Sequence, residues 1–204
     1  MTGRFISFEG IDGAGKSTHI RAVADWFRAR GADVQLSREP GGTPLAETLR
    51  DIVLKEPMGS LTELLLMFAG RRDHVETVIK PALAAGKTLL CDRFTDASFA
   101  YQGGGRGLPL AVLETLADWV QEGTEPELTL WFDLPAAQAA ARRAGAREAD
   151  RIEQQDLDFF ERVRAGYAAR AAKAPGRIVR VDASGTVEQV GAQVLAVLSE
   201  RYPC

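Results

Sequence analysis

Cysteine is scarce in this sequence, and with it the usual marks of a secreted or membrane protein. Only Cys91 and Cys204 occur among 204 residues, and their wide separation fits neither a metal site nor a disulfide framework. We therefore expect a reducing, cytoplasmic environment. We also expect neither a membrane span nor a signal peptide, because no apolar run is long enough and a strand-like segment begins at Phe5.

Histidine and excess positive charge are also sparse. The two histidines, His19 and His74, have no partner at a metal-ligand spacing, so we do not expect either of them to bind a metal. The formal net charge is −3, whereas a protein that binds nucleic acid across its surface is typically basic. These absences argue against a nucleic-acid partner and leave small molecules as the expected ligands.

The sequence also has no repeats and no low-complexity linkers, which predicts a single domain over residues 1–204. Apolar strand patterns alternate with helix patterns along the chain. The predicted strands span residues 4–9, 33–37, 88–91, 128–132 and 178–181. The predicted helices span residues 16–30, 44–54, 61–84, 96–102, 109–121, 156–174 and 186–201, with a further alanine-rich helix before residue 142. This order predicts an α/β fold of three layers, in which helices cover both faces of a five-stranded parallel sheet.

One predicted helix start carries a specific signal. Ser60 stands before an apolar run, and Glu63 follows three residues later, which is the pattern of a capping box. We therefore predict that these two side chains close the amino-terminal end of the long helix.

Residues 10–17, "GIDGAGKS", match the Walker A pattern between a predicted strand and a predicted helix. Glycines allow the backbone to wrap closely around phosphates, and backbone N–H groups with the helix N-terminus balance the phosphate charge. Lys16 is expected to reach the β- and γ-phosphates, and Ser17 to bind Mg²⁺. A glycine-rich turn that merely caps a helix is the alternative. The predicted ATP-binding residues are Gly10, Asp12, Gly13, Ala14, Gly15, Lys16, Ser17 and Thr18.

Two acids end apolar strands and could complete a magnesium site. Asp92 follows one predicted strand and Asp133 follows another. A turn or cap role accounts for Asp133, which precedes a proline and a helix. Asp92 stands next to Arg93, a pairing that suits the movement of charge between two phosphates, so we favour Asp92.

The rest of the chain favours a kinase over a nucleotide-driven switch or motor. It contains no Asn-Lys-x-Asp segment of the kind that reads guanine, whereas residues 142–153 are dense in arginine. Such a stretch can be a solvated helix face. A phosphoryl-transfer site, however, needs cations and a lid that excludes water, so we predict a short helical lid at about 142–153.

Several motifs occur in order between residues 9 and 184: "EGIDGAGKST", "SREPGGTPLAETLR", "RRDHVETVIKPAL", "CDRF", "AYQGGGRG", "DRIEQQDLDFFERVRAGY" and "VDAS". Together they resemble the bacterial thymidylate kinases, a family of P-loop nucleoside monophosphate kinases, over essentially the whole chain. The resemblance implies transfer of the γ-phosphate of ATP to dTMP, giving dTDP. It also implies Mg²⁺ as a cofactor and a homodimeric assembly.

The resemblance also implies roles at the phosphate end of the acceptor site. Glu39 and Pro40 would line the site, and Arg50 would lie near the dTMP phosphate. Arg93 would bridge the donor and acceptor phosphates, while Asp92 would help to hold the metal. Asp12 would lie near the sugar 3′-hydroxyl or the metal.

At the base end, the resemblance implies that Arg71 reaches the thymine O4. Gln102 and Ser98 would read the edge of the base. Tyr101 would pack beside the deoxyribose, where its bulk disfavours a 2′-hydroxyl.

The charge that assists the transfer is expected from the lid. Some family members carry a basic residue inside the cradle, but here Gly13-Ala14 occupies that position. The chain thus resembles the type with catalytic arginines in the lid, and the resemblance leaves Arg143, Arg147 and Arg151 as candidates.

The chain departs from the family at the base platform. Relatives usually place a phenylalanine four residues before the base-reading arginine, whereas here that position is Met67 and Phe68 follows. Adjacent helix residues point about 100° apart, so only one of two registers can hold: Met67 with Arg71, or Phe68 with Arg72. A third alternative is that Phe68 belongs to the core.

Two other functions stay open at this point. One is a kinase of the same fold with a different acceptor, which the combination of Arg71 and Gln102 argues against. The other is a P-loop ATPase that regulates a partner, which would hydrolyse ATP without phosphorylating a small molecule.

Overall fold

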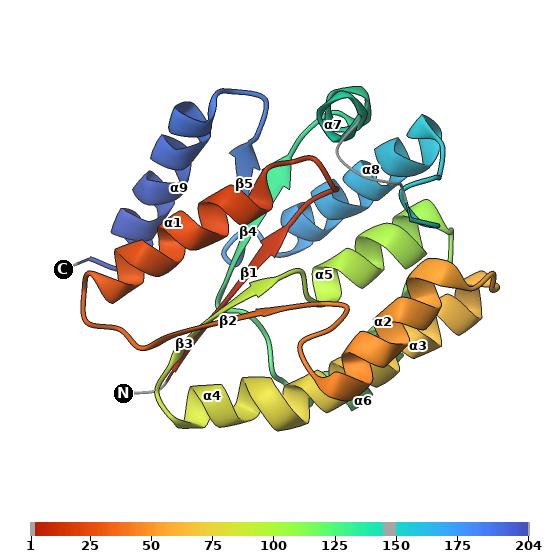
Figure 1. Cartoon of the computed structure of the whole chain (residues 1–204), viewed down its shortest axis with the longest axis horizontal. Helices are drawn as coiled ribbons and strands as arrows, with labels where there is room; N and C mark the ends of the chain where they lie inside the picture. The colour runs from red at the N-terminus through yellow and green to blue at the C-terminus, as the bar shows by residue number, and fades with distance from the viewer. Residues whose placement is uncertain (1–2, 145–149, 204) are drawn as a thin grey trace.

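The computed structural model of the chain, which describes residues 3–144 and 150–203, is built around one twisted parallel sheet (Figure 1). The sheet order is β2-β3-β1-β4-β5. Every neighbouring pair of strands is parallel. The strands are β1 (Arg4–Glu9), β2 (Val34–Arg38), β3 (Thr88–Asp92), β4 (Leu128–Asp133) and β5 (Ile178–Asp182). The predicted five-stranded α/β fold is confirmed.

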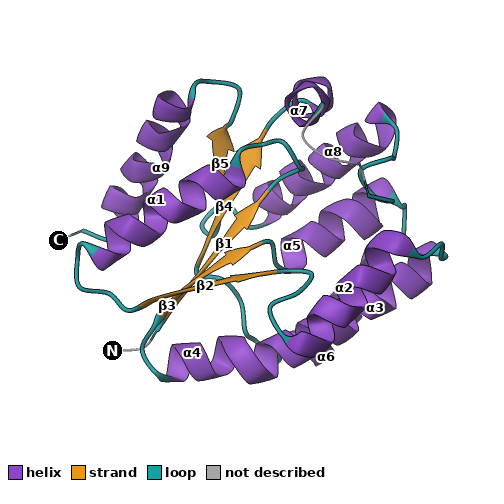
Figure 2. Cartoon of the chain, in the orientation of Figure 1, coloured by secondary structure: helices purple, strands orange, loops and turns teal. Residues whose placement is uncertain are grey.

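Helices cover both faces of the sheet (Figure 2). On one face α1 (Lys16–Arg28) packs beside α9 (Val187–Arg201). The other elements are α2 (Pro44–Lys55), α3 (Ser60–His74), α4 (Lys80–Ala84), α5 (Thr95–Ser98), α6 (Leu110–Gln121), α7 (Ala136–Arg143) and α8 (Leu157–Lys173). Within residues 3–144 and 150–203, no helix has both the length and the apolar composition to cross a membrane.

The central strands are apolar on both faces because helices cover them on both sides. Ile6, Phe8, Leu90, Leu130 and Phe132 have no exposed surface and form the middle of the core. Burying each such side chain contributes about 1.5–3 kcal/mol. This burial fixes the strands in register and leaves polar residues at their carboxyl ends.

Two stretches predicted as regular helix contain π-helical turns. Between α3 and α4 lies η1 (Val75–Ile79), where Pro81 cannot donate a backbone hydrogen bond to the preceding turn. The predicted helix at 96–102 is α5 followed by η2 (Phe99–Gly105). η2 packs closely against α8, where a Cβ on Gly104 would lie 2.7 Å from a backbone oxygen and one on Gly166 would lie 2.9 Å from Ala100.

The predicted capping box at the start of α3 is wrong. Gly59 is the N-cap residue, it forms no side-chain cap, and Ser60 is already helical. Glu63 is 1% exposed, and its carboxylate accepts hydrogen bonds from Gln102, Arg106 and Arg151. These side-chain donors, two of them charged, hold the carboxylate in the interior and away from the helix terminus.

Candidate active site

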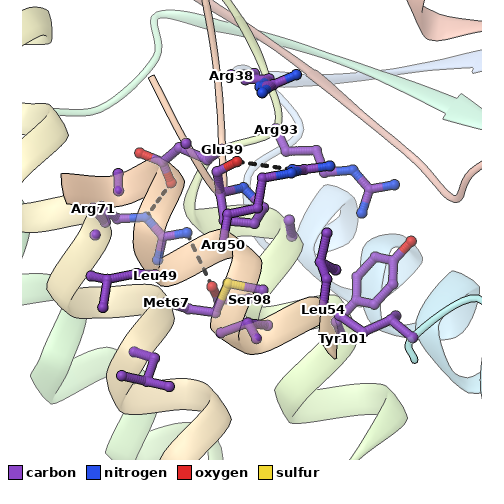
Figure 3. Close-up of a pocket in the computed structure, with 18 of the residues that line it drawn as sticks. Arg38, Glu39, Leu49, Arg50, Leu54, Met67, Arg71, Arg93, Ser98 and Tyr101 are labelled. Atoms are coloured by element: carbon purple, nitrogen blue, oxygen red, sulfur yellow. Dashed lines mark hydrogen bonds and ion pairs between the residues drawn. The ribbon is translucent and has the colours of Figure 1, made fainter. Parts of the chain in front are cut away.

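The cradle and the acceptor residues meet at the carboxyl edge of the sheet. Phe8 on β1 is paired with Asp92 on β3, so the loop after β1 lies beside the turn after β3. A pocket, called here the main pocket, opens at this edge (Figure 3). It is lined by Asp92 and by every predicted dTMP-site residue except Phe68, namely Asp12, Glu39, Pro40, Arg50, Met67, Arg71, Arg93, Ser98, Tyr101 and Gln102.

The cradle depends on glycines in its loop. Gly10, Gly13 and Gly15 all have positive φ, which side chains rarely adopt. A Cβ on Gly13 would also lie 2.5 Å from the Ala139 carbonyl oxygen on α7. Gly15 is the N-cap of α1, so the loop leads directly into the helix N-terminus, where Ser17 and Thr18 are exposed.

Lys16 folds back over this loop. Its Nζ donates hydrogen bonds to the carbonyl oxygens of Gly10 at 3.0 Å and Ile11 at 3.3 Å. The side chain is 5% exposed, and burial together with the nearby Arg93 charge lowers the pKa of its ammonium group. The ammonium group is therefore held inside the cradle and is poised for an anionic partner.

An ion pair joins the cradle to the turn after β3. Arg93 Nη2 lies 2.9 Å from Asp12 Oδ1, and the guanidinium group lies 4.9 Å from the centre of the Tyr101 ring. Burial opposes the ionisation of Asp12, but the charges of Arg93, Lys16 and Arg143 outweigh it and lower its pKa to about 2. Asp12 therefore stays charged throughout the neutral range.

The backbone of Arg93 is held in a left-handed conformation, with φ at 68°. Its N–H donates to Phe8 O at 2.9 Å, and the next N–H, of Phe94, donates to Glu9 Oε1 at 2.7 Å. Cys91 Sγ donates to the Arg93 carbonyl oxygen at 3.1 Å. Such a conformation costs about 1–3 kcal/mol, so these bonds from the strands are what maintain it.

Glu9 was not predicted to have a role, because it reads as the last residue of an apolar strand. It has no exposed surface, and its second oxygen accepts a hydrogen bond from the Tyr167 hydroxyl at 2.9 Å. Burial, reinforced by the charge of Asp96, raises the pKa of Glu9 to about 8. The strand that leads into the cradle thus also holds the Arg93 turn.

The two strand-ending acids differ in their surroundings. Asp133 accepts hydrogen bonds from Arg164 at 2.6 Å and Arg180 at 2.7 Å, so its charge is already balanced. Asp92 lines the main pocket, and its Oδ1 is buried with no hydrogen-bond partner among the described residues. A buried carboxylate oxygen without a partner is a suitable ligand for a hard cation such as Mg²⁺.

Arg71 is fixed at the other end of the pocket. Its Nε donates to Glu39 Oε2 at 2.8 Å and its Nη2 to Ser98 Oγ at 3.0 Å, as Figure 3 shows. The other oxygen of Glu39 contacts His74 Nδ1 at 2.8 Å, and His74 Nε2 contacts Ser37 Oγ at 2.6 Å. His74 is fully buried, and both of its ring nitrogens are used in this chain of contacts, called here the relay, from Ser37 through His74 and Glu39 to Arg71.

The structure separates the two registers of the base platform. Met67 lines the main pocket together with Arg71. Phe68 is 2% exposed and packs in a core cluster with Leu64, and Arg72 points outward to ion pairs with Glu76 and Glu122. Met67 and Arg71 therefore share the pocket-facing side of α3, and Phe68 belongs to the core.

Several of the residues that line the pocket carry unpaired polar atoms. Arg71 Nη1, Gln102 Oε1 and the Tyr101 hydroxyl are buried and have no hydrogen-bond partner within the described residues. Arg50 Nη1 donates to the Pro40 carbonyl oxygen at 2.9 Å, next to the cis Glu39–Pro40 bond. Buried polar groups are almost always paired in proteins, so these atoms mark where a polar ligand belongs.

Helical spacing on α3 could have identified more of this site. Glu63, Met67, Arg71 and His74 recur at intervals of four, four and three residues, which places them on one face of a helix. Glu63 and His74 were missed because a capping pattern explained the first and the second had no partner nearby in sequence.

The predicted lid arginines have different surroundings. Arg151 donates to Glu63 Oε2 at 2.6 Å and to the Val53 carbonyl oxygen at 2.9 Å. Arg143 ends α7, its guanidinium group lies 4.7 Å from the Phe160 ring centre, and its Nη1 is buried without a partner in the described chain. Arg147 lies outside the described residues, as do residues 145–149 of the predicted lid.

Comparisons with known proteins agree with this geometry. The thymidylate kinase family profile matches residues 8–194. The thymidylate kinase of Paracidovorax citrulli is 58% identical over 98% of this chain and 94% of its own, and that of Polaromonas sp. is 58% identical over 90% and 91%. The crystal structure of thymidylate kinase from Ehrlichia chaffeensis superposes with a TM-score of 0.82 at 33% identity, covering 97% of this chain and 100% of that one. The chain belongs to the thymidylate kinase family, whose fold is that of the P-loop nucleoside monophosphate kinases.

Proposed function

We propose that the main pocket receives dTMP and the cradle receives ATP, so that the two phosphates meet at Arg93. As a member of its family, the protein transfers the γ-phosphate of ATP to dTMP and releases dTDP. The observation that carries the assignment of the pocket is its set of unpaired buried polar atoms, Arg71 Nη1, Gln102 Oε1 and the Tyr101 hydroxyl, beside the cradle.

On the donor side, Lys16 and the loop residues Gly10, Gly13, Ala14 and Gly15 hold the phosphates of ATP. The backbone N–H groups of the loop and the N-terminus of α1 supply partial positive charge. Lys16 exchanges its two carbonyl partners for phosphate oxygens, which offsets the burial of its ammonium group by direct contact with an anion.

On the acceptor side, Arg93 lies where both phosphates can contact its guanidinium group. Arg50 and Glu39–Pro40 form the wall beside the phosphate end, while Arg71, Ser98 and Gln102 read the base. Met67 takes the platform position under the base, and Tyr101 closes the site beside the sugar. Asp12 orients Arg93 through their ion pair and can accept a hydrogen bond from a sugar hydroxyl.

Mg²⁺ fits this site through Asp92 and Ser17. The unpaired Oδ1 of Asp92 and the exposed hydroxyl of Ser17 are oxygen ligands of the type that Mg²⁺ prefers. Across the described residues, no cluster of three or more His, Cys, Asp or Glu side chains could hold a metal alone. When bound with the nucleotide, Mg²⁺ would neutralise phosphate charge.

We assign the lid role to the segment around residues 142–153. Arg143 supports this assignment, because its charge already lowers the pKa of Asp12 at the edge of the cradle. Its unpaired Nη1 can donate to a transferring phosphate. Arg151 donates hydrogen bonds to Glu63 and to the Val53 carbonyl oxygen, and these bonds attach the carboxyl end of the segment to α2 and α3.

A homodimer in the cytoplasm is the proposed assembly and location. α3 and α6 lie side by side and expose large apolar residues: Leu61, Leu65, Leu110, Val112 and Trp119. Trp119 is 74% exposed, which is costly for a monomer, so this face supports a dimer contact. The free thiol of Cys91 is consistent with a reducing compartment.

Measuring ADP release with a panel of nucleoside monophosphates tests the proposal. We expect dTMP to give by far the highest kcat/KM, with phosphorylated product matching ADP. Equal or better turnover with UMP, CMP or AMP would contradict the assignment of the acceptor. ATP turnover without a phosphorylated nucleotide would instead indicate a regulatory ATPase.

A further inference from the structure

A buried carboxylate lies behind the base end of the main pocket. Glu63 on α3 is not part of the pocket wall, yet its Oε1 accepts a hydrogen bond from Gln102 Nε2 at 2.9 Å and a longer one from Arg106 Nε at 3.3 Å. Its Oε2 accepts from Arg106 Nη2 at 3.1 Å and from Arg151 Nη2 at 2.6 Å. Burial opposes ionisation of this carboxyl, but the hydrogen bonds from Gln102, Arg106 and Arg151 outweigh it and lower the pKa of Glu63.

The charge of Glu63 determines which end of the Gln102 amide faces the pocket. A glutamine side chain has a donor end and an acceptor end, whereas an ionised carboxylate can only accept. Glu63 therefore binds the NH₂ group of Gln102, and the amide oxygen must point away from it. That oxygen is buried and has no hydrogen-bond partner among the described residues, and Gln102 lines the main pocket.

The residues that line the pocket thus include one unpaired donor and one unpaired acceptor, and neighbouring side chains fix the orientation of both. Arg71 Nη1 is the donor, and Glu39 and Ser98 hold its guanidinium group in place. Gln102 Oε1 is the acceptor. The thymine edge carries a carbonyl oxygen beside a ring N–H and matches this pair, whereas the cytosine edge carries an amino group beside an unprotonated ring nitrogen and opposes it at both positions.

We propose that Glu63 is a positioning residue for base specificity, which fixes the amide of Gln102 so that the site accepts a ring N–H and rejects cytosine. The proposal rests on the proposed function, because it takes the pocket to receive a pyrimidine nucleotide. Glu63 touches no substrate and acts through Gln102.

Glu63→Gln is the decisive variant. Oε2 receives two guanidinium hydrogen bonds, at 3.1 and 2.6 Å, whereas Oε1 receives one, the longer bond from Arg106 Nε at 3.3 Å. The new amide therefore places its oxygen at the Oε2 position and turns its NH₂ group toward Gln102. Gln102 then has to reverse and present its NH₂ group to the pocket. In the double variant Glu63→Gln/Gln102→Glu, the carboxylate at 102 accepts from the amide at 63 and again offers an acceptor to the base.

The measurement is kcat/KM for dTMP and for dCMP at saturating ATP, in four proteins: wild type, E63Q, E63Q/Q102E and E76Q. We expect E63Q to lower the dTMP-to-dCMP ratio at least about tenfold, mainly through the KM for dTMP, because a mispaired buried polar group is strongly discriminating. The KM for ATP should stay within about twofold, and the double variant should recover most of the ratio. Glu76→Gln, the same change in an exposed ion pair with Arg72, should leave the ratio unchanged.

Two results would overturn the proposal: equal proportional losses for both nucleotides in E63Q, or no recovery in the double variant. If E63Q does not fold, the double variant decides alone, because only the proposed role predicts that it still prefers dTMP. A wild-type protein without activity on dTMP would contradict the proposed function itself, which is a separate outcome.

Discussion

The cradle and the base end of the main pocket are built in opposite ways. The cradle is one continuous loop whose shape comes from glycine backbone angles and which leads into the N-terminus of α1, where backbone N–H groups can donate to an anion. The base end is a relay of side chains, Ser37 to His74 to Glu39 to Arg71, contributed by β2, the loop after it and α3. Phosphates of every nucleotide are alike and can be bound by backbone, whereas a particular base needs donors and acceptors that only side chains can place.

Arg93 connects these two regions, so its removal is expected to have the largest effect. Arg93→Ala should lower kcat about 10³-fold, because an arginine at the transferring phosphate is worth at least that much in related sites. The affinity for ATP should change only a few-fold, since Lys16 and the loop remain. Single-turnover kinetics and ATP titration measure the two quantities, and a kcat within a few-fold of wild type would show that Arg93 does not act on the phosphates.

The two strand-ending acids test whether the metal belongs to the phosphate region. Asp92→Asn should lower activity about 10- to 100-fold and raise the Mg²⁺ concentration needed for half-maximal rate. Asp133→Asn should keep turnover but lower the free energy of unfolding by about 1–3 kcal/mol, because Arg164 and Arg180 lose a shared buried carboxylate. Mg²⁺ titrations and urea denaturation of both variants measure these effects. If Asp133→Asn raised the Mg²⁺ requirement and Asp92→Asn did not, Asp133 would be the metal ligand instead.

The relay at the base end is tested by His74→Phe, which keeps a ring and removes both hydrogen bonds. We expect the KM for dTMP to rise about tenfold with little change in kcat, because Glu39 loses a partner and Arg71 is held less firmly. His19→Phe is the matched control, since His19 lies on α1, stacks on Phe132 of β4 and is not among the residues that line the main pocket. A change in the KM for ATP instead of the KM for dTMP would show that His74 supports the cradle and not the base end of the pocket.

Glu9 holds the turn between the two regions, and its proton is expected to affect stability and not turnover. Its pKa is raised from 4.5 to about 8, so between these values the folded protein keeps a proton that the unfolded chain releases. The contribution of Glu9 to stability is therefore full below about pH 4.5 and is lost as the pH rises toward about 8. Between pH 5 and pH 8, the free energy of unfolding of the wild type should fall relative to that of Glu9→Gln, which has no proton to lose at this position. A difference between the two proteins that stays constant with pH in urea denaturation would contradict this pKa.

The sequence was sufficient for the fold and the cradle because both depend on local patterns. Apolar runs between helical periods predict the strands, and "GIDGAGKS" requires no distant partner to be recognised. The π-helical turn of η2 could not be predicted, because it depends on the contact between Gly104 and α8. The orientation of Glu63 likewise depends on Arg106 and Arg151, which lie far away in sequence.

The choice between Met67 and Phe68 shows the same limit. Both are apolar and adjacent, so composition cannot say which one faces the pocket. The packing of Phe68 with Leu64, Phe99 and Leu113 decides it, and these contacts come from three different elements.

The buried thiol of Cys91 makes the Arg93 turn open to observation by chemical labelling. Burial raises the pKa of this thiol, and its Sγ donates a hydrogen bond to the Arg93 carbonyl oxygen. Cys91 in the folded protein should therefore react very slowly with thiol reagents. Reaction then requires β3 and the turn to separate from the sheet, and its rate reports the free energy of that opening. In a Cys204→Ser background, with Cys91 as the remaining thiol, the dependence of the labelling rate on nucleotide would measure how firmly each substrate closes this part of the protein.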